Sequence, residues 1–215
     1  MNLVCLDLEG VLVPEIWINF ALKTGIEELK LTTRDIPDYD VLMNKRLAIL
    51  DENNLKLKDI QKVIASMDPL PGAYDFLQNL RERTQLIILS DTFDQFAAPL
   101  MKKLDWPTLF CNTLVVDETN RISGYTLRQK DGKKKAVNAF QSLGCRVMAS
   151  GDSYNDLTMI QNADKGMFFR APDSISKEYP QYPTVTEYND LLYAVDEFMA
   201  QDRVLSSLEP VNKLS

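Results

Sequence analysis

The hydrophobic positions of this chain form strand-like runs and helix-like repeats. Short, mostly apolar runs at residues 4–6, 86–89 and 146–150 are typical of strands buried in a parallel sheet. Apolar residues at helical spacing predict helices at residues 73–83, from residue 93, from residue 133 and after residue 156. The segments 110–117 and 121–129 predict a β-hairpin. The alternation of strand and helix predicts an α/β fold, a Rossmann-like parallel sheet with helices on its faces.

A long helical stretch separates the first strand from the rest. Between residues 14 and 70 apolar side chains recur at helical spacing, as at Ile16 and Phe20 or at Leu42 and Met43. We therefore expect a small helical cap domain, residues 14–70, inserted after the first strand. Residues 1–13 and 71–200 then form the core, and residues 201–215 form a frayed C-terminal tail.

Two acids end the first strand. Side chains alternate along a strand, so Asp7 and Glu9 leave the same face and converge. Two carboxylates at such a short separation disfavour each other's ionisation unless a metal ion or a shared proton lies between them. The alternative is a strand that ends in a solvated acidic turn.

Polar residues also follow the other two predicted strands. Ser90 and Asp91 come directly after the run at 86–89, where they either cap the next helix or help to bind a phosphate. Asp152 follows the segment 146–150, and Asp156 is expected to cap the next helix. Ligands bind at the carboxyl ends of the strands in an open α/β sheet, so these residues are predicted to gather at one edge.

Three consecutive lysines, Lys133 to Lys135, occupy the first turn of a predicted helix. The helix dipole disfavours cations there, which indicates a compensating interaction. We expect one of the three to reach back toward the strand ends and neutralise a phosphoryl group, and the other two to be solvated.

The composition narrows the chemistry. Histidine is absent from all 215 residues, which excludes Ser-His-Asp and Cys-His machinery and histidine metal sites. Acid, base and metal chemistry therefore depends on carboxylates, lysine, cysteine or tyrosine, and carboxylates suit magnesium. The net charge of −7 argues against long nucleic acid as a partner.

Cysteines and hydropathy indicate the cellular setting. Cys5, Cys111 and Cys145 have no close metal-binding spacing and are expected to be reduced. No basic and apolar leader is visible, and no apolar segment approaches the length that spans a bilayer. The expectation is a cytoplasmic enzyme without a membrane partner.

Four short motifs carry a resemblance to a known family. With "DLEGV", "SDT", Lys133 and "GDSYND" in this order, the chain resembles the haloacid dehalogenase (HAD) superfamily of phosphotransferases. The segments "LDLEGVLVPEIW" and "RDIPDYDVLMNKR" are similar to its branch of phosphoserine phosphatases and homoserine phosphotransferases. This resemblance implies a HAD-like core, serine biosynthesis as the setting, and a small-molecule substrate, O-phosphoserine, with homoserine as a further acceptor.

The resemblance also implies roles for single residues. Asp7 is the nucleophile that forms an aspartyl phosphate, Glu9 is the general acid, and Lys133 neutralises the phosphoryl group. The implied ligands of Mg²⁺ are Asp7, the main-chain carbonyl of Glu9, and Asp152, with Asp156 supporting the site.

The implied substrate-binding residues come from the core and from the cap. They are Ser90, Asp91, Asn155, Glu15 and Arg46. Glu15 and Arg46 match positions that hold the amino and carboxylate groups of phosphoserine, and the guanidinium fork of Arg46 suits a carboxylate.

Glu9 departs from the family pattern, which usually has aspartate at this position.

Three alternatives to a phosphoserine phosphatase remain open. The enzyme could act on another small phosphomonoester. A D-x-E motif at an early strand end also begins 3′–5′ exonucleases, and a non-catalytic relative would only bind a phosphorylated ligand. The oligomeric state is not predictable from these residue types.

Overall fold

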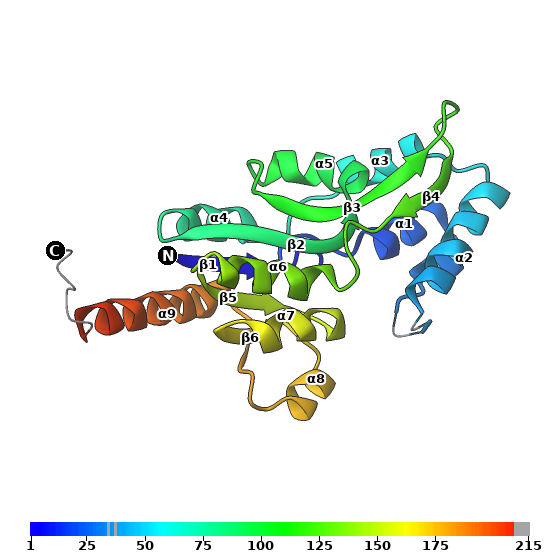
Figure 1. Ribbon diagram of the computed structural model, residues 1–215. Helices are drawn as coiled ribbons and strands as arrows, with labels where there is room; N and C mark the ends of the chain where they lie inside the picture. The colour runs from blue at the N-terminus through cyan, green and yellow to red at the C-terminus, as the bar shows by residue number, and fades with distance from the viewer. Residues whose placement is uncertain (34, 37, 209–215) are drawn as a thin grey trace. The chain divides into compact units, whose positions relative to one another are not determined.

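The computed structural model describes residues 1–33, 35–36 and 38–208, with side chains described as far as residue 201. Its strands are β1 (Asn2–Leu6), β2 (Gln85–Phe93), β3 (Leu109–Val116), β4 (Ile122–Thr126), β5 (Arg146–Gly151), β6 (Lys165–Phe169) and β7 (Thr184–Val185). Its α-helices are α1 (Ile16–Thr24), α2 (Tyr39–Glu52), α3 (Leu57–Ala65), α4 (Ala73–Arg81), α5 (Asp94–Lys103), α6 (Gly132–Ser142), α7 (Leu157–Asn162), α8 (Asp173–Glu178) and α9 (Tyr188–Leu208) (Figure 1). Two 3₁₀ turns, η1 (Glu27–Lys30) and η2 (Tyr154–Asp156), complete the order.

The strands form one sheet in the order β4-β3-β2-β1-β5-β6-β7. The pairs β1–β5, β2–β3, β5–β6 and β6–β7 are parallel, and β3–β4 is the antiparallel hairpin predicted from the sequence. The predicted α/β fold with a mostly parallel sheet is therefore confirmed. Strand order reverses at β1, and in open α/β sheets the crevice beyond the carboxyl ends at such a point is where ligands bind.

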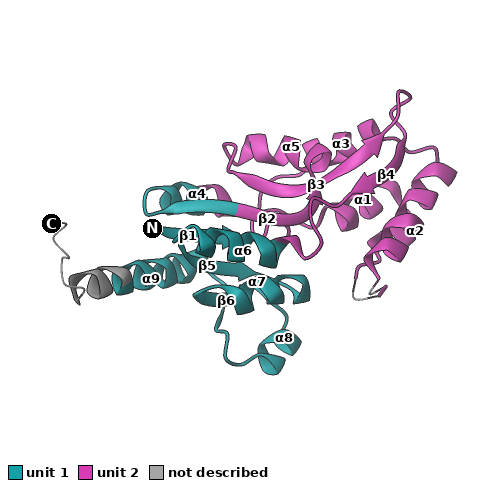
Figure 2. Cartoon of the chain, viewed as in Figure 1, with its two compact units in different colours: residues 1–6, 75–87, 133–215 teal, residues 7–74, 88–132 magenta. Residues whose placement is uncertain are grey.

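The chain divides into two compact units, coloured separately in Figure 2. The first comprises residues 1–6, 75–87 and 133–215, with β1 and β5 to β7. The second comprises residues 7–74 and 88–132, so it holds helices α1 to α3 together with α5 and the β3–β4 hairpin. The predicted cap, residues 14–70, lies inside this second unit.

Each unit has an apolar core that follows from its residue pattern. In the first, the predicted strand residues Val4, Cys5 and Met148 are fully buried. In the second, Ile16 and Phe20 are buried on α1, and Leu42, Met43 and Leu50 are buried on α2. The helical spacing seen in residues 14–70 therefore corresponds to real helices with one buried face.

One strand boundary differs from the prediction. The sequence predicts a strand that ends at Leu89, followed by polar residues that either cap the next helix or help to bind a phosphate, but β2 continues to Phe93. Helix α5 begins only at Asp94, and its N-cap residue, Phe93, makes no side-chain capping bond. The capping interpretation is wrong because Thr92 and Phe93 are strand-forming residues whose side chains are buried. The register between β2 and β3 shifts after Leu89.

The C-terminal region is more regular than expected. Helix α9 continues to Leu208, and the sequence from Gln201 to Leu208 contains no glycine or proline to end a helix. The remainder of the predicted tail, residues 209–215, lies outside the described residues. In the part of the chain that the structure covers, no helix has both the length and the apolar content needed to cross a bilayer.

Candidate active site

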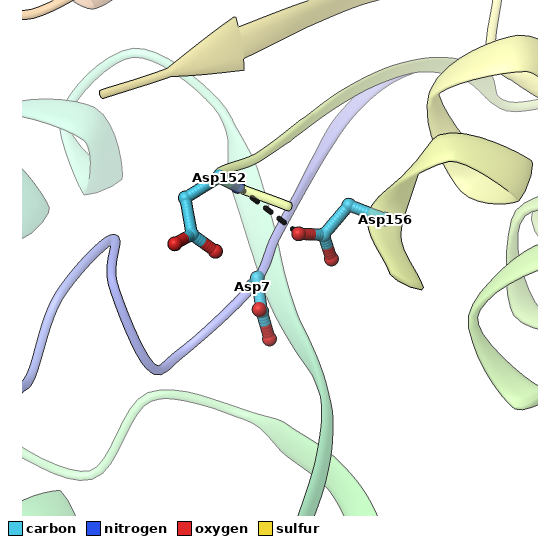
Figure 3. Close-up of side chains that lie close together, drawn as sticks. All are labelled: Asp7, Asp152 and Asp156. Atoms are coloured by element: carbon cyan, nitrogen blue, oxygen red, sulfur yellow. Dashed lines mark hydrogen bonds between the residues drawn. The ribbon is translucent and has the colours of Figure 1, made fainter. Parts of the chain in front are cut away.

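Three carboxylates meet beyond the ends of β1 and β5. One oxygen from each of Asp7, Asp152 and Asp156 lies within 4.8 Å of the others (Figure 3). The strand register explains their meeting, because Leu6 pairs with Ser150. Asp7 directly follows the first partner, and Asp152 lies two residues beyond the second. The predicted gathering of these two acids at one edge is therefore present in the structure.

Asp156 has a local role beyond the one predicted. Its buried carboxylate accepts the backbone N–H groups of Asp152 at 3.0 Å and Ser153 at 3.1 Å. It makes no side-chain capping bond to α7. Asp156 occupies the N-cap position of α7, as predicted, but its carboxylate turns back to its own loop, where η2 aligns N–H groups that it can accept.

Lys133 contacts the same carboxylate. Its Nζ lies 2.7 Å from Oδ1 of Asp156, and both side chains are buried, with 4% and 0% exposure. Lys134 is half-buried and Lys135 is exposed, so one of the three lysines turns inward, as expected. Such a buried, hydrogen-bonded pair holds both side chains in fixed positions.

Gly151 leaves the space that Asp156 occupies. A Cβ atom built on Gly151 would lie 2.1 Å from Cγ of Asp156, closer than packed atoms can approach. The glycine before Asp152 is therefore required by the approach of this carboxylate to the strand end.

Glu9 lies beside the start of α1. Its Oε2 accepts the backbone N–H of Ile16 at 2.8 Å. Burial of the carboxyl group, together with the neighbouring Glu15 carboxylate, raises the pKa of Glu9 to about 8. Hydrogen bonds from the Ile16 N–H and the Thr92 hydroxyl lower the pKa, but by less. A carboxyl with this pKa carries a proton at neutral pH, the state that a general acid needs.

Arg46 on α2 is buried although it is charged. Its guanidinium lies over the Trp17 ring, 4.5 Å from the centroid, and Nη2 donates to the Leu31 carbonyl at 2.8 Å. Burial lowers the pKa of Arg46 to about 10, partly offset by the nearby Glu9, Tyr39 and Glu15. Its buried Nε has no hydrogen-bond partner among the described residues, so a donor remains available for an acceptor on a ligand.

The remaining predicted residues lie on β2 and on the turn after β5. Ser90 is buried on β2, and its Oγ accepts the Thr92 N–H at 3.2 Å. Asp91 next to it is exposed. Asn155 is exposed on the turn after β5, where its Oδ1 is hydrogen-bonded by the Ser153 hydroxyl.

Four residues near the site were not predicted from the sequence: Trp17, Tyr39, Thr92 and Asn112. A signal for Asn112 existed, since a polar residue within the strand "LFCNTLVV" has to satisfy its amide when it is buried. Tyr39 and Trp17 gave no comparable signal, because aromatic residues at helical spacing are ordinary core residues.

The acidic cluster fits a hard divalent cation. Carboxylate oxygen is the ligand type that magnesium prefers, and the carboxylates of Asp7, Asp152 and Asp156 outnumber the Lys133 ammonium beside them. The surplus negative charge would be neutralised by a cation. One oxygen of the Glu9 carboxylate, Oε2, accepts the Ile16 N–H, and a main-chain role of Glu9 toward the metal stays a prediction.

Comparison with known proteins identifies the family. The family model of the haloacid dehalogenase-like hydrolases matches residues 1–164. The chain is 60% identical over 191 residues to "Phosphoserine phosphatase ThrH" of Pseudomonas aeruginosa, which covers 89% of this chain and 93% of that protein. It is 59% identical over 191 residues to "Phosphoserine phosphatase" of Pseudomonas syringae pv. tomato, and the match covers 89% of this chain and 81% of that protein.

A solved structure shows the same fold at much lower identity. It is described as "Phospho-Aspartyl Intermediate Analogue of Phosphoserine phosphatase", and it matches with a TM-score of 0.71, 19% identity, and coverage of 90% of this chain and 98% of that one. The fold class and the superfamily predicted from the four motifs are confirmed. The chain belongs to the haloacid dehalogenase-like hydrolases.

Proposed function

We propose that this chain is a magnesium-dependent phosphoserine phosphatase that forms an aspartyl phosphate on Asp7. The observation that carries the proposal is the meeting of Asp7 with Asp152 and Asp156, next to the buried Lys133. The names of the two Pseudomonas relatives agree with it. The family match argues against an exonuclease as the explanation of the D-x-E motif.

The metal would be held by Asp7, Asp152 and the main-chain carbonyl of Glu9, with Asp156 supporting the site. Bound magnesium would neutralise charge on the phosphoryl oxygens. Asp156 acts by fixing the N–H groups of the turn that carries Asp152 and by holding the Lys133 ammonium.

The first half of the reaction transfers the phosphoryl group to the protein. A carboxylate oxygen of Asp7 attacks phosphorus, and the bond between phosphorus and the serine oxygen breaks. Glu9 gives its proton to that oxygen, so serine leaves as a neutral alcohol. Ser90, the Asp91 N–H, Lys133 and Asn155 hold the phosphoryl oxygens.

The second half releases phosphate. Glu9, now ionised, takes a proton from water while the water oxygen attacks phosphorus. The bond between phosphorus and the Asp7 oxygen breaks, which restores the Asp7 carboxylate and the protonated Glu9. Its surroundings suit both steps, because they raise the pKa of Glu9 to about 8, near the pH of the medium.

The cap supplies selectivity for phosphoserine. Arg46 would grip the substrate carboxylate through its unpaired Nε and its guanidinium fork. The Glu15 carboxylate would take the amino group. Both charges already interact with Glu9 in this structure, which supports a substrate held between the cap and the Asp7 region.

The first experiment follows phosphate release from phosphoserine with magnesium and with EDTA, for wild type and Asp7→Asn. An amide cannot attack phosphorus, so the rate of phosphate release by Asp7→Asn should fall on the order of 10⁴-fold or more. Its circular dichroism spectrum should match that of wild type. A single-stranded oligonucleotide and a panel of small phosphate esters tested beside phosphoserine cover the alternatives. Near wild-type turnover by Asp7→Asn would refute the aspartyl phosphate.

Homoserine is a second acceptor that the same site would accommodate. It carries the amino and carboxylate groups that Glu15 and Arg46 would bind, and its hydroxyl would replace water beside Glu9. A bound acceptor has a high effective concentration at phosphorus, and the extra methylene of Glu9 relative to aspartate suits a hydroxyl on a longer side chain.

Phosphorus NMR tests this second acceptor directly. In a mixture of enzyme, magnesium, phosphoserine and homoserine, part of the phosphate should appear as phosphohomoserine, and Glu9→Asp should change the ratio of transfer to hydrolysis. Inorganic phosphate as sole product at every homoserine concentration would leave a plain phosphatase. The cytoplasmic location and the place in serine biosynthesis stay predictions.

A further inference from the structure

The carbonyl oxygen of Asp91 accepts hydrogen bonds from two distant side chains. Asn112 on β3 donates from Nδ2 at 3.0 Å, and Tyr39, the first residue of α2, donates from its hydroxyl at 3.4 Å. A carbonyl oxygen has two lone pairs and accepts both. All three residues belong to the second unit.

The same peptide group is held at its other end. The Thr92 N–H, which shares a planar peptide with the Asp91 carbonyl, donates to Oγ of Ser90 at 3.2 Å. These bonds fix the orientation of the peptide between Asp91 and Thr92, which adjoins the peptide that carries the Asp91 N–H. Because Ser90 Oγ accepts from Thr92, its own hydrogen is directed to another acceptor.

Asn112 uses both ends of its amide. Its Oδ1 accepts the backbone N–H of Arg128 at 3.0 Å, in the segment that leads to α6, while Nδ2 holds Asp91. The side chain is buried, so an unsatisfied end would be costly. Asparagine supplies the donor and the acceptor that this position needs, whereas aspartate or leucine would lack the donor.

We propose that Asn112 and Tyr39 are positioning residues for phosphoryl binding. Acting through the Asp91 carbonyl, they aim the Ser90 hydroxyl and the Asp91 N–H at the phosphoryl oxygens. Tyr39 belongs to the cap helix, so cap packing and phosphoryl binding are coupled through this one carbonyl. The inference rests on the proposed function and adds to it residues from outside the four motifs.

Two variants separate these bonds from general stability. Asn112→Asp keeps the size and the acceptor for Arg128 but removes the donor to Asp91 and adds a negative charge, so Tyr39→Phe, which removes only the hydroxyl, is the decisive variant. Each should raise the Kd for inorganic phosphate, measured by calorimetry with magnesium, and the KM for phosphoserine by roughly threefold to tenfold. The rise in Tm on adding magnesium should match wild type, because the carboxylate cluster is untouched.

The chain offers matched controls. Tyr125→Phe removes the hydroxyl that bonds Asp40 on the same helix, and the Tyr125 ring packs edge-on against Tyr39. Thr113→Val changes the exposed neighbour of Asn112 on β3. Both controls should bind phosphate as wild type does.

The outcomes are distinct. Wild-type phosphate affinity in Tyr39→Phe and Asn112→Asp, or an equal loss in Tyr125→Phe, overturns the inference. If Asn112→Asp does not fold, Tyr39→Phe decides alone. Tyr39-dependent phosphate binding without phosphoserine hydrolysis would instead contradict the proposed function and leave this inference standing.

Discussion

Arg46 on α2 is buried although its side chain is charged. It contacts the Trp17 ring and the Leu31 carbonyl, and its Nε has no hydrogen-bond partner among the residues that the structure describes. If this guanidinium holds the substrate carboxylate, Arg46→Ala should lower kcat/KM for phosphoserine by roughly tenfold to a hundredfold, since a charged hydrogen bond contributes about 1.5–3 kcal/mol. Steady-state kinetics with purified variant gives the measurement.

Phosphoethanolamine is the control substrate for Arg46, because it keeps the amino group and lacks the carboxylate. Arg46→Ala should change its kcat/KM little. Equal losses on both esters would mean that Arg46 serves the fold or the phosphoryl group. Arg46→Lys keeps the charge without the fork, so an intermediate loss on phosphoserine is expected.

Gly151 gives a second prediction for a single residue. A methyl group there would lie 2.1 Å from Cγ of Asp156 and displace its carboxylate. Gly151→Ala should therefore lower the free energy of unfolding by about 1–3 kcal/mol and reduce phosphate release, as measured by urea denaturation and the phosphate assay. Gly124→Ala is the control, because its Cβ would lie 3.9 Å from Cβ of Val115. A fully active and stable Gly151→Ala would show that Asp156 can move without cost.

Residues at strand ends were predictable, and residues that act across the chain were not. Asp7 and Asp152 each stand directly beyond a short apolar run, and a parallel sheet brings such positions to one edge. Glu15 and Arg46 were found only through the family resemblance, since isolated charges on helices are usually solvated. Tyr39 and Asn112 bond Asp91 across 52 and 21 residues, separations that local patterns do not encode.

Among the secondary-structure elements, the β3–β4 hairpin also bonds the N-terminus of α3. The carbonyl of Asn120 in its turn accepts the Leu57 N–H at 3.1 Å, and its Oδ1 accepts the Lys58 N–H at 2.8 Å. Asn120 thus caps helix α3 from 62 residues away. Arg121 beside it pairs with Asp51 at the end of α2, so the hairpin turn is bonded to the ends of two cap helices.

Removing the hydrogen bond from the Lys58 N–H to the Asn120 side chain should destabilise the second unit. Asn120 has φ of 67°, which glycine also adopts, so Asn120→Gly isolates the lost side-chain bond, whereas Asn120→Ala adds backbone strain. We expect a loss of about 0.5–2 kcal/mol of unfolding free energy for Asn120→Ala and a smaller loss for Asn120→Gly. Arg121→Ala, which removes an exposed ion pair, should change the stability less than Asn120→Ala does. Urea denaturation measures all three, and an Asn120→Ala protein as stable as wild type would contradict the capping role.

The element boundaries show where local patterns fail. The predicted end of β2 at Leu89 was wrong because Ser90 to Thr92 are polar, and polar residues after an apolar run are commonly helix caps. In the structure the strand continues, with Ser90 and Thr92 buried. Their polar groups are satisfied by contacts within and around the turn, which sequence spacing does not reveal.

At the scale of the whole molecule, the acidic cluster links metal binding to stability. In the absence of metal, Asp7, Asp152 and Asp156 repel one another at the sheet edge. A cation that binds only the folded state stabilises it by about 2.7 kcal/mol at a hundred times its Kd. For a chain of this size, magnesium should therefore raise Tm by roughly 5–10 °C.

Asp152→Asn should change stability in opposite directions with and without metal. In EDTA the variant should melt at or above the wild-type Tm, because one repelling charge is gone, whereas in magnesium its rise in Tm should be much smaller, because a metal ligand is lost. Glu118→Gln is the control: this exposed residue of the β3–β4 turn changes the net charge equally without touching the cluster, so it should keep the full magnesium response. Differential scanning calorimetry in the two buffers supplies the measurement. A full magnesium shift in Asp152→Asn would mean that the cation binds elsewhere, and a Tm in EDTA well below wild type would mean that the Asp152 carboxylate stabilises the metal-free fold.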